Sequence, residues 1–333
     1  MANIKGKRWP YIVCVVLQTV IFGSGNVLTK FAYESISPLW CLSIRFGLAA
    51  LVFAALFGPR IVRQLRRARL RDWLPAALCM GAVYLFCNVA LGLTTATNVG
   101  FLVALPVVFT PLVASLVFRR RYPRMLIPFQ VAVVAGLYLL CSNGGSFSFG
   151  WGELFAVLSS LSLAGALVFS QDALEKLDAV AISGAQIGVT FLMALACALA
   201  FEAPVDVGVV QPVAWGAIAF LALFSTCLTF ALQNISLVGL PSSTVSLLLT
   251  GEPVFTALFS WLWLGEMLAG MGAAGAALIV GAVVGATCLE ERGASEGVAD
   301  PSESAADLPD VGVTAFEAEG LAERRALVGD QAA

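Results

Sequence analysis

The sequence predicts an all-α integral membrane protein with ten transmembrane helices arranged as two inverted five-helix repeats. Three observations predict this fold. The 333-residue chain is 59% hydrophobic and only 12% charged, with a mean hydropathy of +0.91, which is outside the range of soluble domains. Apolar runs of about 20 residues, the length that crosses ~30 Å of hydrocarbon, recur along the chain. One residue pattern also occurs twice, in the fourth and in the ninth of these runs.

The first half of the chain contains five of the expected spans. Lys5, Lys7 and Arg8 resemble the start of a signal peptide, but no small-residue cleavage site follows the first span. We therefore expect a retained helix there. Helix is required throughout because lipid cannot satisfy open backbone groups. The five spans are expected at residues 11–30, 38–58, 73–91, 96–118 and 125–142.

The second half contains the other five spans. The ninth is the most polar of the ten, and the tenth is rich in glycine. Glycines in a membrane helix favour close packing, either within the protein or between protomers, so a homodimer is a candidate assembly. The five spans are expected at residues 150–171, 180–201, 213–235, 242–263 and 267–288.

The repeated pattern is Gly-Leu-x3-Thr-x4-Leu-x3-Pro-Val. It occurs at Gly92–Val107 and at Gly239–Val254, a constant offset of 147 residues. An internal duplication of a five-span unit explains it, with repeats at residues 11–142 and 150–288. Because five is odd, the second copy enters the membrane with the opposite orientation. Inverted repeats of this kind are typical of secondary transporters.

The distribution of basic residues predicts the orientation. With residues 1–10 in the cytoplasm, fifteen lysines and arginines face the cytoplasm and Lys30 alone lies at the outer edge, as the positive-inside rule requires. Ten spans then return the C-terminus to the cytoplasm, so both termini are expected inside, in a multi-pass protein of the cytoplasmic membrane. Residues 289–333 carry eleven acidic and three basic residues and are expected to form a disordered tail.

Ionisable and amide side chains inside the spans are the candidate site residues. Charge at membrane depth costs a few kcal/mol, so each such group is a functional candidate. Glu252 lies between Gly251 and Pro253, which are expected to break the ninth helix, and Pro106 repeats that break without a carboxylate. The remaining candidates are Arg45, Gln186 at the equivalent position of the second repeat, Lys30, Asn26, Gln233 and Asn234. Each has a structural alternative, an ion pair or a hydrogen bond between helices.

Several function classes are disfavoured. The chain has no histidine, and none of its eight cysteines forms a C-x-x-C pair, so we expect no catalytic residue, no metal site and no cofactor. No phosphate-binding Walker sequence is present, which argues against direct use of ATP. The arginine-rich loops are explained by topology and anionic lipid, so no nucleic acid is expected as a partner.

These residues, in order, resemble the EamA-type transporters of the drug/metabolite transporter superfamily. The resemblance implies two five-helix repeats around a central cavity, alternating access and a small-metabolite substrate, with Lys30, Arg45, Glu252 and Glu266 at positions that the family fills similarly. Phe118–Arg121 departs from the family, which often has a Gly-Glu pair there. The resemblance is carried by Phe22–Lys30, Ser43–Phe46, Gln233–Pro241, Gly251–Phe255, Leu264–Glu266 and the glycine-rich last span.

The expected function is that of a secondary active transporter that exports a small, amino-acid-like metabolite. A desolvated Glu252 could exchange a proton, the candidate coupling ion, or bind a substrate ammonium. Arg45 or Lys30 could bind an anionic group of the substrate. Two alternatives stay open: a membrane scaffold or accessory subunit that transports nothing, and an integral-membrane enzyme.

Overall fold

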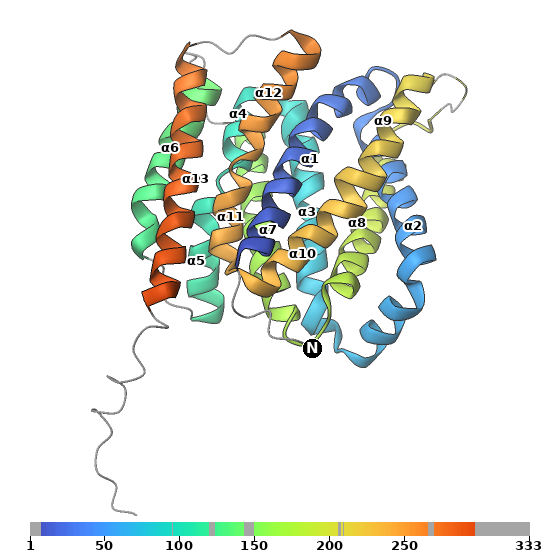
Figure 1. Cartoon of the computed structure of the whole chain (residues 1–333). Coiled ribbons are helices and arrows are strands. Elements are labelled where there is room, and N and C mark those ends of the chain that lie inside the picture. The colour runs from blue at the N-terminus through green and yellow to red at the C-terminus, as the bar shows by residue number, and fades with distance from the viewer. Residues whose placement is uncertain are drawn as a thin grey trace, which may run out of the picture. The chain divides into compact units, whose positions relative to one another are not determined.

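The structure, a computed structural model, describes residues 8–94, 96–119, 124–142, 150–205, 208, 210–265 and 270–296. Every regular element in these residues is a helix (Figure 1). The first half contains α1 (Trp9–Tyr33), α2 (Pro38–Arg67), α3 (Leu70–Leu93), α4 (Ala96–Val103), α5 (Pro106–Phe118), η1 (Arg124–Leu126) and α6 (Ile127–Ser142). The second half contains α7 (Trp151–Ala173), α8 (Ala179–Phe201), α9 (Pro212–Ala222), η2 (Leu223–Leu228), α10 (Thr229–Gly239), α11 (Ser242–Leu249), α12 (Glu252–Leu264) and α13 (Gly270–Glu296).

Eight helical stretches among the described residues are long and apolar enough to cross a membrane. They are α1, α2, α3, α7, α8, α13, the continuous run from α9 to α10, and the α11–α12 pair. Two shorter apolar helices, Pro106–Phe118 and Ile127–Leu139, lie where the fourth and fifth spans are expected. The chain is therefore a multi-pass membrane protein, and its described elements are all helices. The ten-span count and the inverted repeats remain predictions.

Prolines mark the starts of five helices. A proline occupies the first or second position of α1, α2, α5, α9 and α12, where its missing N–H costs no hydrogen bond. Helix α2 continues past the expected end of its span at residue 58 to Arg67, with Pro59 inside it. The arginine-rich segment after the second span is thus partly helical rather than a loop, because a helix needs no apolar side chains once it leaves hydrocarbon.

The helices of the two halves pack against each other. Helix α3 packs on α7, and α2 packs on α8, while α1 contacts α9, α10 and α12 (Figure 1). One apolar cluster contains Phe46 of α2, Met80 of α3, Ile187 of α8 and Phe230 of α10. The described residues up to Thr287 form one compact unit. Of the predicted tail, residues 289–296 are the last turns of α13, and the rest lies outside the described residues.

Two stretches are interrupted in the middle. Helix α4 ends at Val103 and α5 begins at Pro106, while α11 ends at Leu249 and α12 begins at Glu252. A proline leaves the carbonyl four residues earlier without its N–H partner. Around α5 those carbonyls are satisfied by neighbouring helices. The Ser160 hydroxyl of α7 donates to the Leu102 carbonyl, and Gln130 Nε2 of α6 donates to the Val107 carbonyl at 3.1 Å.

Candidate functional site

Two glycines let α1 approach the second half of the chain closely. A Cβ on Gly23 would lie 2.6 Å from Phe255 Cβ and 2.8 Å from the Thr256 backbone N, so α1 and α12 meet there almost backbone to backbone. A Cβ on Gly25 would lie 2.7 Å from Ser225 Oγ of η2. Only glycine permits both contacts without movement of a neighbour. The glycines therefore place the next residue, Asn26, beside the break in the ninth span.

Asn26 and Glu252 meet at that break. Asn26 Nδ2 donates to Glu252 Oε1 at 2.8 Å and to Thr256 Oγ1 at 3.1 Å. Glu252 is the first residue of α12, where the positive end of the helix dipole stabilises a carboxylate. Asn26 is exposed and Glu252 is half-buried. The structure thus brings together two of the predicted site residues, 226 positions apart in sequence, and leaves them accessible.

Arg45 of α2 is buried and hydrogen-bonded to η2. Its Nε donates to Thr226 Oγ1 at 2.7 Å, and its Nη2 donates to the Ser225 carbonyl at 2.7 Å and to Ser225 Oγ at 3.3 Å. The guanidinium also lies 5.5 Å from the ring centre of Phe46 and 5.6 Å from that of Tyr84, within cation–π range. A coulombic attraction acts between Arg45 and Glu252. Arg45 is therefore held by hydrogen bonds to η2 and interacts with Glu252 only at longer range.

The η2 segment that Arg45 binds is a π-helical turn within the eighth span. Such turns widen an α-helix by one residue and occur frequently at functional sites, because they release backbone carbonyls from the regular ladder. This turn is not among the features predicted from sequence. The available signal was the polar pair Ser225-Thr226 inside an otherwise apolar run, which the arginine and the Gly25 contact now explain.

Three predicted site residues bridge helices. Asn234 Nδ2 of α10 donates to Ser183 Oγ at 2.9 Å and to Gln186 Oε1 at 2.8 Å, both on α8. Gln186 Nε2 in turn donates to Ser170 Oγ of α7 at 2.9 Å. Gln233 accepts a hydrogen bond from Gln18 Nε2 of α1 at 2.9 Å. All three are at most 2% exposed, so their geometry matches the structural alternative, a polar link between membrane helices.

A tyrosine and an asparagine extend the polar set on the side of Arg45. Tyr33 Oη donates to Asn88 Oδ1 at 3.0 Å, and Asn88 Nδ2 donates to the Tyr84 carbonyl at 2.8 Å. Tyr33 is not among the residues predicted from sequence.

Two expected groups cannot be placed. Lys30 lies in the last part of α1, but its side chain lies outside the described residues, as does the whole of Glu266. Among the described residues, no group of three or more Cys, Asp or Glu could hold a metal ion. The group that the structure does assemble is a carboxylate, an exposed amide and a buried guanidinium. This group includes one negatively and one positively charged side-chain type.

The chain is similar to known transporters along most of its length. Residues 9–142 and 150–288 match the model of the EamA-like transporter family. The threonine/homoserine exporter RhtA of Salmonella typhimurium is 28% identical over 292 residues, which are 85% of this chain and 93% of that protein. An uncharacterized transporter of Archaeoglobus fulgidus is 24% identical over 270 residues, or 81% of this chain and 83% of that protein. The uncharacterized transporter YoaV of Bacillus subtilis is 24% identical over 267 residues, or 76% and 88%.

A solved crystal structure has a similar fold. It superposes with a TM-score of 0.75 over 86% of this chain and 99% of its own, at 19% sequence identity. At that identity the likeness concerns the fold alone.

Proposed function

Because the chain belongs to the EamA-like transporter family, we propose that this membrane transporter is a secondary active exporter of small amino-acid-like metabolites. The substrate class is supported by the similarity to a protein named as a threonine/homoserine exporter. It is also supported by the two signs of charge at the site. We place the protein in the cytoplasmic membrane with both termini inside, working by alternating access of two inverted five-helix repeats.

The observation that carries the proposal is the contact between Asn26 and Glu252. A carboxylate at the start of a broken membrane helix, held by one exposed amide, can exchange that amide for a substrate ammonium. Its negative charge is then neutralised by the substrate, or by a proton when the site is empty of substrate. This exchange couples binding to a change in the contact between α1 and α12, and makes a proton the proposed coupling ion.

Arg45 contributes the opposite charge. Its guanidinium attracts Glu252 without being bonded to it, so a zwitterion between the two would have its carboxylate toward Arg45 and its ammonium toward Glu252. The hydrogen bonds to Ser225 and Thr226 hold the guanidinium in place, which lowers the ordering cost of binding. Gln186, Gln233 and Asn234 act as fixed links between the helices around this site.

The test is transport by the purified protein in liposomes loaded with a mixed pool of amino acids and metabolites, with efflux followed by mass spectrometry. We expect selective loss of one class of zwitterion, stimulated by an opposing proton gradient. Glu252→Gln should reduce the rate at least tenfold, the equivalent of about 1.4 kcal/mol. Glu34→Gln, which changes an exposed carboxylate after α1, is the matched control and should transport normally.

Each other outcome has a distinct meaning. Normal transport by Glu252→Gln across pH 5–8 would exclude Glu252 as a proton carrier, whatever the substrate. Efflux of compounds without an ammonium group would contradict the amino-acid-like substrate but would still support a transport function. Folded protein that moves no compound from this pool or from a broader one would favour the scaffold function.

A further inference from the structure

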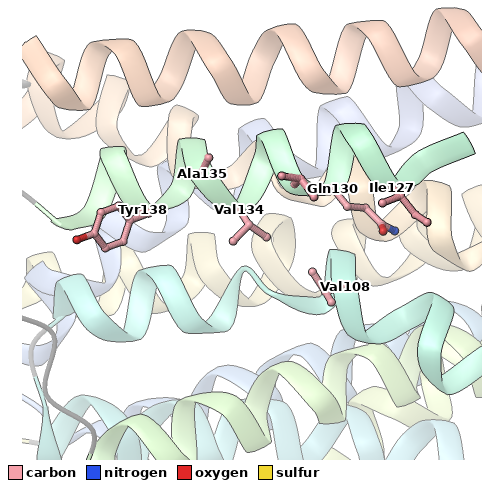
Figure 2. Close-up of a pocket in the computed structure, with 7 residues that line it drawn as sticks. Val108, Ile127, Gln130, Val134, Ala135 and Tyr138 are labelled. Atoms are coloured by element: carbon pink, nitrogen blue, oxygen red, sulfur yellow. The ribbon is translucent and has the colours of Figure 1, made fainter. Parts of the chain in front are cut away.

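An apolar groove lies beside the break in the fourth span, outside the site described above. It has a volume of about 550 Å³ and is lined by Val108, Ile127, Gln130, Val131, Val134, Ala135 and Tyr138. Figure 2 shows Ile127, Gln130, Val134 and Tyr138 spaced along α6, with Val108 of α5 facing them. Their spacing of three or four residues keeps them on one face of the helix.

The groove opens away from the helix bundle. Val131 is 64% exposed, Tyr138 49% and Ile127 42%. Helix α6 is an apolar helix of a multi-pass membrane protein, so the open side of the groove meets lipid rather than water. An occupant must therefore be a molecule that lies within the bilayer.

The floor of the groove exposes no unsatisfied backbone carbonyl at Val107. Pro111 has no N–H to offer the Val107 carbonyl, and Gln130 Nε2 donates to that carbonyl instead, at 3.1 Å. Gln130 lines the groove but is only 5% exposed, so little of its amide is presented to the groove surface. A hydrocarbon chain can pack here without burying an open carbonyl, which would otherwise cost several kcal/mol.

The length of the groove matches one leaflet. From Ile127 to Tyr138 the helix rises about 16 Å at ~1.5 Å per residue, roughly half of the ~30 Å hydrocarbon thickness. At the Ile127 end the chain connects back to α5, whose exposed C-cap Arg119 is the first of four arginines between residues 119 and 124. The positive charge of Arg119 at this end of the groove attracts an anionic headgroup.

We propose that the groove binds one acyl chain of a membrane phospholipid, with an anionic headgroup at its Ile127 end. The acyl chain fills the space between α6 and the α4–α5 break. On the orientation expected from the arginines, this lipid belongs to the cytoplasmic leaflet.

The test uses phosphatidylglycerol that carries a photoreactive diazirine on its acyl chain, in liposomes containing the full-length protein. Adducts are mapped by mass spectrometry of peptides after illumination. We expect them to concentrate between Ile127 and Tyr138. Ala135→Trp, which fills the groove, should lower adducts on α6 about tenfold, the equivalent of ~1.4 kcal/mol of binding. Ala277→Trp on α13, also at an exposed alanine, is the matched control and should leave them unchanged.

Several results would overturn the proposal. Adducts spread evenly over all exposed helices would indicate only bulk lipid, and adducts insensitive to Ala135→Trp would place the chain elsewhere. Displacement of the adducts by the transported solute would assign the groove to substrate, and cross-links between two protein chains would assign it to a second copy. If Ala135→Trp does not fold, competition on the wild type decides: unlabelled phosphatidylglycerol should reduce the adducts more strongly than phosphatidylcholine, and equal competition would contradict the headgroup assignment.

Discussion

Arg45 shows how a charged side chain can be accommodated at membrane depth. Its guanidinium donates to two hydroxyls and one carbonyl of the π-helical turn and lies beside two aromatic rings. Arginine suits this position because its donors form a rigid fork, whereas a lysine ammonium is a single mobile point of charge. Arg45 therefore positions η2 and supplies positive charge near Glu252 at the same time.

This dual role predicts the behaviour of Arg45→Lys. The lysine cannot bond to Thr226 Oγ1 and the Ser225 carbonyl together, so we expect a loss of about 1.5–3 kcal/mol, the range for a hydrogen bond to a charged group. Thermal unfolding of the purified protein in detergent measures it. Thr226→Val removes one of the three acceptors, and the double variant should lose less than the sum of the two single losses. Strict additivity would show that the contact contributes nothing to stability.

The pairing of Asn26 with Glu252 could be predicted only in part. Both residues were selected from sequence, because an amide and a carboxylate inside apolar runs are costly unless they have a purpose or a partner. That each is the partner of the other depends on Gly23 and Gly25, which bring α1 against α12 and η2. No periodicity in the sequence reports a contact across 226 residues.

Among the helices, the contact between α1 and α12 depends on the absence of a side chain at Gly23. A Cβ on Gly23 would clash with the backbone of α12 as well as with Phe255. Backbone atoms cannot rotate away as a flexible side chain can, so a substitution forces the whole of α1 outward.

We therefore expect Gly23→Ala to destabilise the protein by about 1–3 kcal/mol, the usual cost of overpacking, and to slow transport because Asn26 moves away from Glu252. Gly188→Ala is the matched control. It lies inside α8, and a Cβ there would meet nothing within 4 Å, so alanine should stabilise that helix by up to about 1 kcal/mol. Unfolding midpoints and transport rates are measured for both. Equal midpoints for the two variants would mean that α1 and α12 are farther apart than described.

Helix interruptions were visible in the sequence in one case and hidden in another. Proline predicts a break because it lacks an N–H. Helices α5 and α12 do begin at or beside a proline, Pro106 and Pro253. The π-helical turn of η2 contains no proline or glycine. It forms where Arg45 and Gly25 from other helices meet the chain, and local propensity does not encode that meeting.

At the scale of the whole molecule, the two halves of the chain are tied together at both ends of the α2–α8 pair. At one end Glu202, which follows α8, accepts hydrogen bonds from Ser37 Oγ at 2.6 Å and from the Trp40 backbone N at 3.0 Å. At the other end Asp178 caps α8 and accepts from Arg60 Nε at 2.6 Å. During transport α2 and α8 must therefore move together, or the hydrogen bonds at one of these two ends must break.

The number of spans can be tested with reporter fusions. If the fourth and fifth spans both cross, fusions after Arg121 and after Gly145 lie on opposite sides of the membrane. Green fluorescent protein should then be bright only after Arg121, and alkaline phosphatase active only after Gly145. Fusions after Ala68 and after Ser35 are the inside and outside controls. The same reporter signal at Arg121 and Gly145 would show that α6 does not cross, and would contradict the ten-span topology.

Hydrophobic length and composition alone indicated a helical, multi-pass membrane protein, because bilayer thickness converts these local properties directly into helices. The transporter family was indicated by the ordered residues that resemble it and is shown by the family match. The sequence also identified Glu252, Asn26 and Arg45 as residues worth explaining. The helix packing shows which of them meet, that Gln186, Gln233 and Asn234 link helices, and that Arg45 binds a π-helical turn. Those outcomes depend on how closely distant helices approach, which glycine positions allow but do not specify.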